Sequence, residues 1–394
     1  MPKNTISDLV VNGGSPLFES IKSTSNLVQP DPEKFFGYIQ ESFDARWITN
    51  NGPCVRQLEE RLQELHDVKH CVAVCSGFWA LVLTIKNLAL SGRREVVMPS
   101  LTYRRLADIA AWLDLIPRFC EVCPNTLGIT AESAEQCITD ETAIILAPHP
   151  IVNLCDIDGL CALSESTGIP LVFDSVEAAY ATHSGQQLGG FGNAECFSVH
   201  ASKFLNGFEG GYVVTNDDKL ADSLKIMRGF GFRGEDNVES LGMNAKLNDI
   251  HAAMFLAGID DIPDQLSRNR VLYDAYSRGL SGCSLDLVEY NSQELRTHKS
   301  ILVRIGEDWP LSREKTLEIL HSENMLARPY YYPPLHEKTT SYETIVGDLS
   351  RSSNLARHFM LMPSGDFLTE GDVEEICTFL HFLEKNASNI GQTP

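Results

Sequence analysis

Two side chains near the middle of the sequence have the types and spacing needed for nucleophilic and acid–base chemistry. Lys203 follows a short apolar strand pattern that ends at Val199, and a glycine-rich turn at 206–211 comes after it. An amine placed there can point into a cavity, where desolvation lowers its pKa and frees it as a nucleophile. Asp174 directly follows the apolar run Leu171–Phe173. When such a run forms a buried parallel strand, the acid after it lies at the carboxyl edge of the sheet.

This pair suits one cofactor, pyridoxal phosphate. Its aldehyde needs a Schiff-base lysine, and its ring nitrogen needs an acidic partner to stay protonated as an electron sink. A site for its phosphate is also predicted, because the strand pattern Cys71–Cys75 runs through Ser76 and Gly77 into an apolar helix. The amides of Gly77 and Phe78 and the helix dipole would converge on one anion there.

Three stretches around these residues resemble the core of the DegT/DnrJ/StrS aminotransferases. They are Asp174-Ser-Val-Glu-Ala, the run from Gly190 to Lys203, and Glu209-Gly-Gly-Tyr-Val-Val-Thr-Asn-Asp217. These pyridoxal-phosphate enzymes are best known for aminating keto sugars carried on nucleotides. The resemblance covers the chain from about Trp47 to its end.

The resemblance implies roles for particular residues. Lys203 would hold the cofactor and move the proton, and Asp174 would keep the ring nitrogen protonated. Tyr103 would cover the ring face, while Ser198 would hold the phosphate together with the turn at 76–78. Asn244 would reach the phosphate of a partner subunit, which implies a homodimer with shared active sites. A further set is expected near the substrate: Thr49, His149, His200, Arg328, Tyr331 and His336.

Some residues depart from the family pattern. Phe78 stands where relatives have a threonine that donates to the phosphate, and Val152 departs in the loop after His149. Glu177 stands where a neutral, hydrogen-bond-donating glutamine or histidine is usual. Because an ionised carboxylate only accepts hydrogen bonds, we expect Glu177 either to be protonated, donating to the cofactor, or to point elsewhere, with a group such as His149 taking over.

Apolar runs alternate with amphipathic helical patterns, which predicts a mostly parallel sheet covered on both faces. The family implies the aspartate-aminotransferase-like fold, fold type I: a large α/β domain and a small C-terminal α+β domain. We expect the large domain, with an N-terminal arm, at 1–265 and the small domain at 266–394.

Composition and net charge limit the possible binding partners and the cellular location of the protein. A formal net charge of -21 argues against nucleic acid or an anionic membrane, since either would need a basic face. The sequence shows neither a signal-peptide core nor a run of transmembrane length, so we expect a cytoplasmic protein. Its 11 cysteines lack paired zinc spacing, and we predict reduced thiols and no metal site, also at Cys120-Glu-Val-Cys123.

The predicted activity is transfer of an amino group from glutamate or glutamine to a keto group, foremost that of a nucleotide-linked deoxysugar. A dehydratase branch of the family replaces the Schiff-base lysine with histidine, so Lys203 argues against that reaction. Two alternatives stay open. The acceptor could be a non-sugar ketone or aldehyde of a specialised pathway, or the protein could be a non-catalytic, cofactor-binding regulator, as the departures at Phe78, Val152 and Glu177 would suggest.

Overall fold

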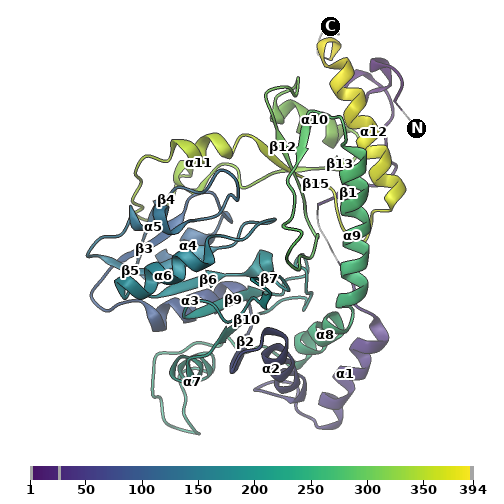
Figure 1. Ribbon diagram of the computed structural model, residues 1–394. Coiled ribbons are helices and arrows are strands. Elements are labelled where there is room, and N and C mark those ends of the chain that lie inside the picture. Colours follow the sequence, from purple (N-terminus) through teal and green to yellow (C-terminus); the bar gives the residue numbers. More distant parts are fainter. Residues whose placement is uncertain (1–2, 25–27, 391–394) are drawn as a thin grey trace.

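A mostly parallel sheet of seven strands forms the centre of the larger part of the molecule (Figure 1). The computed structural model describes residues 3–24 and 28–390. In spatial order the strands are β2 (His70–Val74), β10 (Gly211–Thr215), β9 (Ala194–Ser198), β6 (Leu171–Asp174), β5 (Thr142–Pro148), β3 (Glu95–Pro99) and β4 (Ile116–Cys120). Only β10 runs antiparallel to its neighbours. The predicted α/β fold is confirmed.

Helices cover both faces of this sheet, because alternate strand residues are apolar on both sides. On one face, Val72 and Val74 pack with residues of α3 (Gly77–Leu88), α4 (Leu106–Ala111) and α7 (Asp218–Met227). On the other face, Cys71 and Ala73 pack with α2 (Pro53–His66) and α8 (Asp249–Asp260). Further along that face lie α5 (Ala131–Glu135) and α6 (Ile157–Thr167). The helix α1 (Pro32–Asp44) packs on α8.

Side-chain caps fix where several helices begin. Ser76 accepts a hydrogen bond from Trp79 N at the start of α3, and Asn248 accepts one from His251 N at the start of α8. Such caps satisfy amides that have no acceptor inside the helix. They therefore define the strand-to-helix turns at the edge of the sheet.

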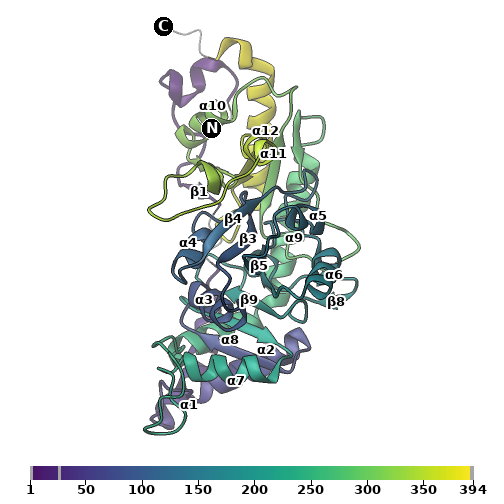
Figure 2. The ribbon, with the colours of Figure 1, turned by 90° about the vertical axis from the view of Figure 1, so that its left-hand side faces the viewer.

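The C-terminal part has its own antiparallel sheet and core. The sheet order is β11 (Leu285–Leu287), β12 (Ile301–Ile305), β15 (Phe359–Met362) and β14 (Arg328–Pro329). Its helices are α10 (Arg313–Ser322), α11 (Ser350–Leu355) and α12 (Glu370–Asn386). The long helix α9 (Ile262–Gly279) joins the two parts: Ile262 packs in a core of the larger part, and Tyr276 packs in the C-terminal core. Figure 2 shows α10 and α12 at one end of the molecule and α2 and α7 at the other.

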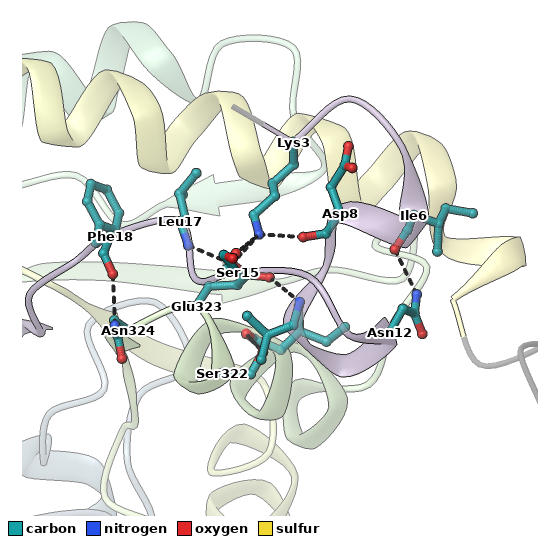
Figure 3. Close-up of polar contacts among 12 residues, drawn as sticks. Lys3, Ile6, Asp8, Asn12, Ser15, Leu17, Phe18, Ser322, Glu323 and Asn324 are labelled. Atoms are coloured by element: carbon teal, nitrogen blue, oxygen red, sulfur yellow. Dashed lines mark hydrogen bonds and ion pairs between the residues drawn. The ribbon is translucent and has the colours of Figure 1, made fainter. Parts of the chain in front are cut away.

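The N-terminal segment lies against the C-terminal part. Leu9, Leu17 and Phe18 belong to its core, and the short strand β1 (Lys22–Ser23) pairs in parallel with β13 (Met325–Leu326). The buried carboxylate of Glu323 holds this segment (Figure 3). It accepts hydrogen bonds from Val10 N at 2.9 Å and Leu17 N at 2.8 Å, and it pairs with Lys3 Nζ at 2.8 Å.

Several elements differ from the sequence patterns. The strand β4 and the short helices α5 and α11 were not apparent in the sequence. Within the ranges described above, no helix combines the length and the apolar character that crossing a membrane requires.

Candidate active site

Lys203 lies in the loop between β9 and β10, at the carboxyl edge of the parallel strands. Its backbone N donates to His200 O at 2.8 Å, which folds the loop back on itself. Its amine is paired with a residue from the next strand: Lys203 Nζ lies 2.5 Å from Glu177 Oε1. Glu177 belongs to a 3-10 turn, η3 (Val176–Ala178), that directly follows β6.

This ion pair sets the charges of the two side chains while Lys203 is a free amine. Burial disfavours the charged form of Lys203, but the carboxylates of Glu177 and Asp174 outweigh it and raise the lysine pKa rather than lower it. Burial likewise opposes the charge on Glu177, yet Lys203 and Lys299 lower its pKa to about 2. The Glu177 carboxylate is therefore directed at the Lys203 amine, and the roles expected of both residues toward the cofactor stay predictions.

Asp174 is the buried acid at the end of β6, with 8% of its surface exposed. Burial raises its pKa to about 6, against opposing effects from the Val176 backbone amide, which donates to it, and from Lys203. A cationic ring nitrogen opposite this carboxylate would remove that penalty, because an opposite charge favours the ionised form. The position suits a pyridinium partner.

The turn before α3 has the features expected of an anion cradle. The first amides of this 12-residue helix have no acceptor within it. A Cβ on Gly77 would lie 2.6 Å from Ser198 Cβ, so only glycine lets the helix start approach the end of β9. Phe78 packs edge-on against Trp79 at 5.4 Å and joins the core on the α3 face, so its side chain serves packing. The amides of Gly77 and Phe78 and the Ser198 hydroxyl fit a phosphate group.

Two tyrosines belong to the same site. Tyr103 lies near both Lys203 and Tyr331. Burial raises the pKa of Tyr331, and the carboxylates of Glu177 and Asp174 raise it further. Tyr103 is 46% exposed. Tyr331 has a φ of 42°, a backbone conformation that costs a non-glycine residue energy and is found most often at functional sites.

Lys299 is a site residue that the sequence reasoning missed. It precedes β12, and its Nζ donates to Ser202 O at 2.8 Å, next to Lys203. Burial lowers its pKa to about 8; Glu177 opposes the shift and Lys203 adds to it. Its place directly before an apolar strand was the one feature of the sequence that could have indicated it. The residue it binds lies about 100 positions earlier, so the sequence around Lys299 does not reveal the contact.

Other predicted residues have local partners. The ring of His149 stacks on Phe173 at 5.4 Å and receives a hydrogen bond from Cys155 N, and burial lowers its pKa to about 3. His200 bonds Ser202 Oγ at 2.9 Å through Nδ1. Both ring nitrogens of His336 face hydroxyls, Ser100 Oγ at 2.5 Å and Ser353 Oγ at 2.9 Å. His336 therefore joins the two parts of the molecule rather than facing Lys203.

Thr49, Asn244 and Arg328 are exposed. Among the described residues, none of the three forms a hydrogen bond or an ion pair with Lys203, Glu177 or Asp174. Asn244 forms an isolated bridge with Gly229. The roles predicted for these residues stay predictions.

The fold and the site together define a class. A lysine in the loop after β9, an acid at the end of β6 and a phosphate cradle before α3, on a mostly parallel seven-stranded sheet, are the parts of a pyridoxal-phosphate-dependent aminotransferase of fold type I. The sequence profile of the DegT/DnrJ/EryC1/StrS aminotransferase family matches residues 30–381. The chain belongs to this family.

Similar proteins agree with that assignment. A GDP-perosamine synthase of Escherichia coli O157:H7 is 29% identical over 350 residues, which cover 86% of this chain and 93% of that protein. The crystal structure of DesI in the presence of its TDP-sugar product superposes with a TM-score of 0.90 at 28% identity, covering 98% of both chains. A Streptococcus pneumoniae protein in its PLP form has the same fold, with a TM-score of 0.83 at 20% identity over 93% of this chain and 99% of that one. The chain is an aminotransferase, and its cofactor is pyridoxal phosphate.

Proposed function

We propose that this chain transfers an amino group from glutamate or glutamine to the keto group of a deoxysugar linked to a nucleotide. The observation that carries the proposal is the cluster of Lys203, Glu177 and Asp174 beside the cradle at Gly77. The sugar nucleotides in the names of the related proteins support the acceptor class.

Pyridoxal phosphate supplies the electron sink that lets a carbon beside the amino group lose a proton. Asp174 would hold the proton on the ring nitrogen, and the amides of Gly77 and Phe78 with Ser198 would bind the phosphate. Lys203 would hold the cofactor and then carry the proton between the reacting carbons. Glu177 accepts a hydrogen bond from the Lys203 amine, so it would orient that amine whenever the lysine is not joined to the cofactor.

The assembly is part of the same proposal. The exposed position of Asn244 supports a homodimer in which this residue reaches the phosphate in the partner subunit. The 11 cysteines are all free thiols, which supports a reducing compartment, and we place the protein in the cytoplasm. We also keep 265/266 as the domain boundary, because it falls within α9, between Ile262 of one core and Tyr276 of the other.

The test separates the two halves of the reaction. Addition of glutamate or glutamine to the yellow protein should shift its absorbance as the cofactor takes up the amino group, and a nucleotide-linked keto-deoxysugar should restore the original spectrum. Lys203→Ala should lose both changes. If the amino donor works but only non-sugar ketones or aldehydes restore the spectrum, the proposed acceptor class is wrong.

A further inference from the structure

Three side chains of the C-terminal part form a cluster with the types and spacing of metal ligands. They are the thiol of Cys283, in the turn between α9 and β11, and the side chains of His381 and Glu384 on α12. One possible ligand atom from each lies within 4.8 Å of the other two. In the part of the chain that the structure describes, no other three histidine, cysteine or acidic side chains meet in this way, although the sequence holds 11 cysteines and 11 histidines.

The fold brings these residues together for reasons that do not involve an ion. His381 and Glu384 are three positions apart on α12, so their side chains share one face of that helix. The helices α9 and α12 lie side by side (Figure 1), and α9 ends at Gly279, shortly before Cys283. The thiol is therefore held against the face of α12 that carries the imidazole and the carboxylate.

Hydrogen bonds orient the two side chains of α12. His381 Nε2 lies 3.0 Å from Gly279 O, and because a carbonyl only accepts, this nitrogen carries the proton. Glu384 Oε1 accepts from Ser284 N at 3.0 Å and from the Ser284 hydroxyl. The other two atoms, His381 Nδ1 and Glu384 Oε2, face each other at 3.9 Å, which is too far for a hydrogen bond. Partners of this kind on the outer atoms of histidine and carboxylate ligands are typical of metal sites.

Without an ion, the same three groups form a polar cluster. The Cys283 thiol donates to the Glu384 carboxylate. In a neutral His381 ring, Nδ1 carries a lone pair and stands opposite a carboxylate oxygen. Two electron-rich atoms that face each other repel, and a cation between them is attracted by both. A divalent ion that replaces the thiol proton therefore interacts favourably with all three groups.

The ligand types select among metals. A thiolate, an imidazole and a carboxylate suit Zn²⁺, whereas Ca²⁺ and Mg²⁺ prefer oxygen ligands alone. Ligand atoms around a tetrahedral zinc ion lie about 3–4 Å apart. The separations in this cluster, 3.9 Å for one pair and within 4.8 Å for all, need only small side-chain movements to match. The side chains of His381 and Glu384 are 27% and 20% exposed, so an ion can enter and keep a water molecule.

We propose that Cys283, His381 and Glu384 bind one Zn²⁺ ion, with water as the fourth ligand. When the ion binds, the S–H bond of Cys283 breaks, the sulfur gives an electron pair to zinc, and the proton passes to the solvent. No oxidant or reductant is needed. The ion links the turn before β11 to α12 and stabilises the C-terminal part.

This proposal departs from the expectation that the chain has no metal site. That expectation followed from the lack of paired zinc spacing among the cysteines. The ligands proposed here come from one cysteine and from a helix about 100 positions later, so cysteine spacing does not reveal them.

The test is direct zinc binding by the protein with its amino-transfer cofactor bound, after dialysis against a chelator. Calorimetry with zinc chloride should show one ion per chain, with a dissociation constant of about 1 μM or less. In buffers of different ionisation enthalpy, it should also show release of about one proton per ion, because the thiol must lose its proton. Either no binding or binding without proton release would overturn the proposal.

Cobalt reports the ligand set. Co²⁺ with a thiolate ligand in a four-coordinate site absorbs strongly at visible wavelengths beyond the absorbance of the cofactor, whereas six-coordinate Co²⁺ on oxygen ligands absorbs weakly. We expect the strong absorbance, and added zinc should remove it by displacing the cobalt. A weak, six-coordinate spectrum would contradict the proposed ligands.

Variants locate the ion. Cys283→Ser, His381→Gln and Glu384→Gln should each weaken zinc binding at least about tenfold. Cys161→Ser is the matched control, because this partly buried thiol lies on α6 in the larger part of the molecule, and it should bind zinc as the unmodified chain does. Circular dichroism checks the fold. If Cys283→Ser does not fold, His381→Gln still decides, since its side chain is partly exposed.

Thermal unfolding gives a second measurement on the same proteins. Zinc should raise the melting temperature of the unmodified chain and of Cys161→Ser, because an ion that binds only the folded state stabilises it. The three ligand variants should show no such rise. Zinc binding and stabilisation that persist unchanged in these variants would place the ion elsewhere and overturn the proposal.

Discussion

At the scale of single residues, Glu177 sets the charge state of the site. Its carboxylate interacts with two amines, Lys203 at 2.5 Å and Lys299, whose own Nζ is tied to Ser202 O. Glu177 favours the protonated form of Lys203. Burial and the charge of Lys203 lower the pKa of Lys299 to about 8, so Lys299 is the amine that loses its proton first.

Glu177→Gln should therefore lower the pKa of Lys203. The nearer of the two anions that raise this pKa is removed, while burial still opposes the charge on the lysine. The rate at which cofactor-free protein takes up pyridoxal phosphate should follow a pH profile displaced toward lower pH, by on the order of one unit. Stopped-flow absorbance measures this rate.

Lys299→Met is a control within the same site. Its pKa is about 8, so Lys299 is uncharged at the pH where Lys203 titrates, and its removal should leave the profile in place. Lys315→Met, an exposed lysine on α10 that pairs with Glu318, should leave the profile in place as well. Equal displacements for Glu177→Gln and Lys299→Met would contradict this account of the charges.

Asp174→Asn should stabilise the cofactor-free protein at neutral pH. The pKa of Asp174 is raised from 3.8 to about 6 by burial, so its folded state binds a proton more tightly than the unfolded chain does. Its favourable contribution is complete below about pH 4 and is lost as pH rises to about 6. At pH 7.5 the asparagine variant should gain about 2–3 kcal/mol in urea unfolding, and the gain should vanish near pH 4. An equal gain at both pH values would exclude the carboxylate charge as its cause.

At the scale of elements, the segment after α10 anchors the N-terminal residues. Glu323 is completely buried and binds two backbone amides and the Lys3 amine. Glu323→Ala should cost about 3 kcal/mol in urea unfolding, because it leaves buried donors without an acceptor. Glu323→Gln should cost less, since its amide oxygen still accepts.

Glu318→Ala is the control within α10, where the carboxylate is exposed and pairs with Lys315. It should change stability by less than about 0.5 kcal/mol. Equal losses for the Glu318 and Glu323 variants would show that the buried contacts do not hold the segment.

Most of these elements follow from local sequence patterns. Apolar strands, caps such as Ser76 and the glycine turns predicted the strand–helix alternation and the places of Lys203, Asp174 and Gly77. The strand β4 was missed because Ile116-Pro-Arg-Phe-Cys120 holds a proline and an arginine, and that arginine is paired with Glu95 of the neighbouring β3.

The charge state of the site could not be predicted in the same way. Burial alone would lower the pKa of Lys203, and the sign changes only because Glu177 and Asp174 lie beside it. The place of Lys299 depends on a contact between segments far apart in the chain, because its amine donates to Ser202 O. Such contacts have no local signal, so periodicity and spacing do not reveal them.

At the scale of the whole molecule, we expect a dimer with shared sites. Lys203→Ala and Asn244→Ala should each be inactive, and sedimentation should show a dimer for both. A mixture whose subunits exchange should recover about a quarter of the activity, since half the dimers are hybrids with one intact site of two. No recovery after proven exchange, or a fully active monomer, would contradict the shared site.

The most direct test of the central claim is to find which lysine carries the cofactor. Borohydride reduction of the yellow protein, followed by peptide mass spectrometry, should place one phosphopyridoxyl group on Lys203, and the Lys203→Arg variant should carry none there. Lys299 is the natural internal comparison, because its amine lies in the same site. A label on Lys299 or another lysine, or no label on protein that holds the cofactor, would contradict the account.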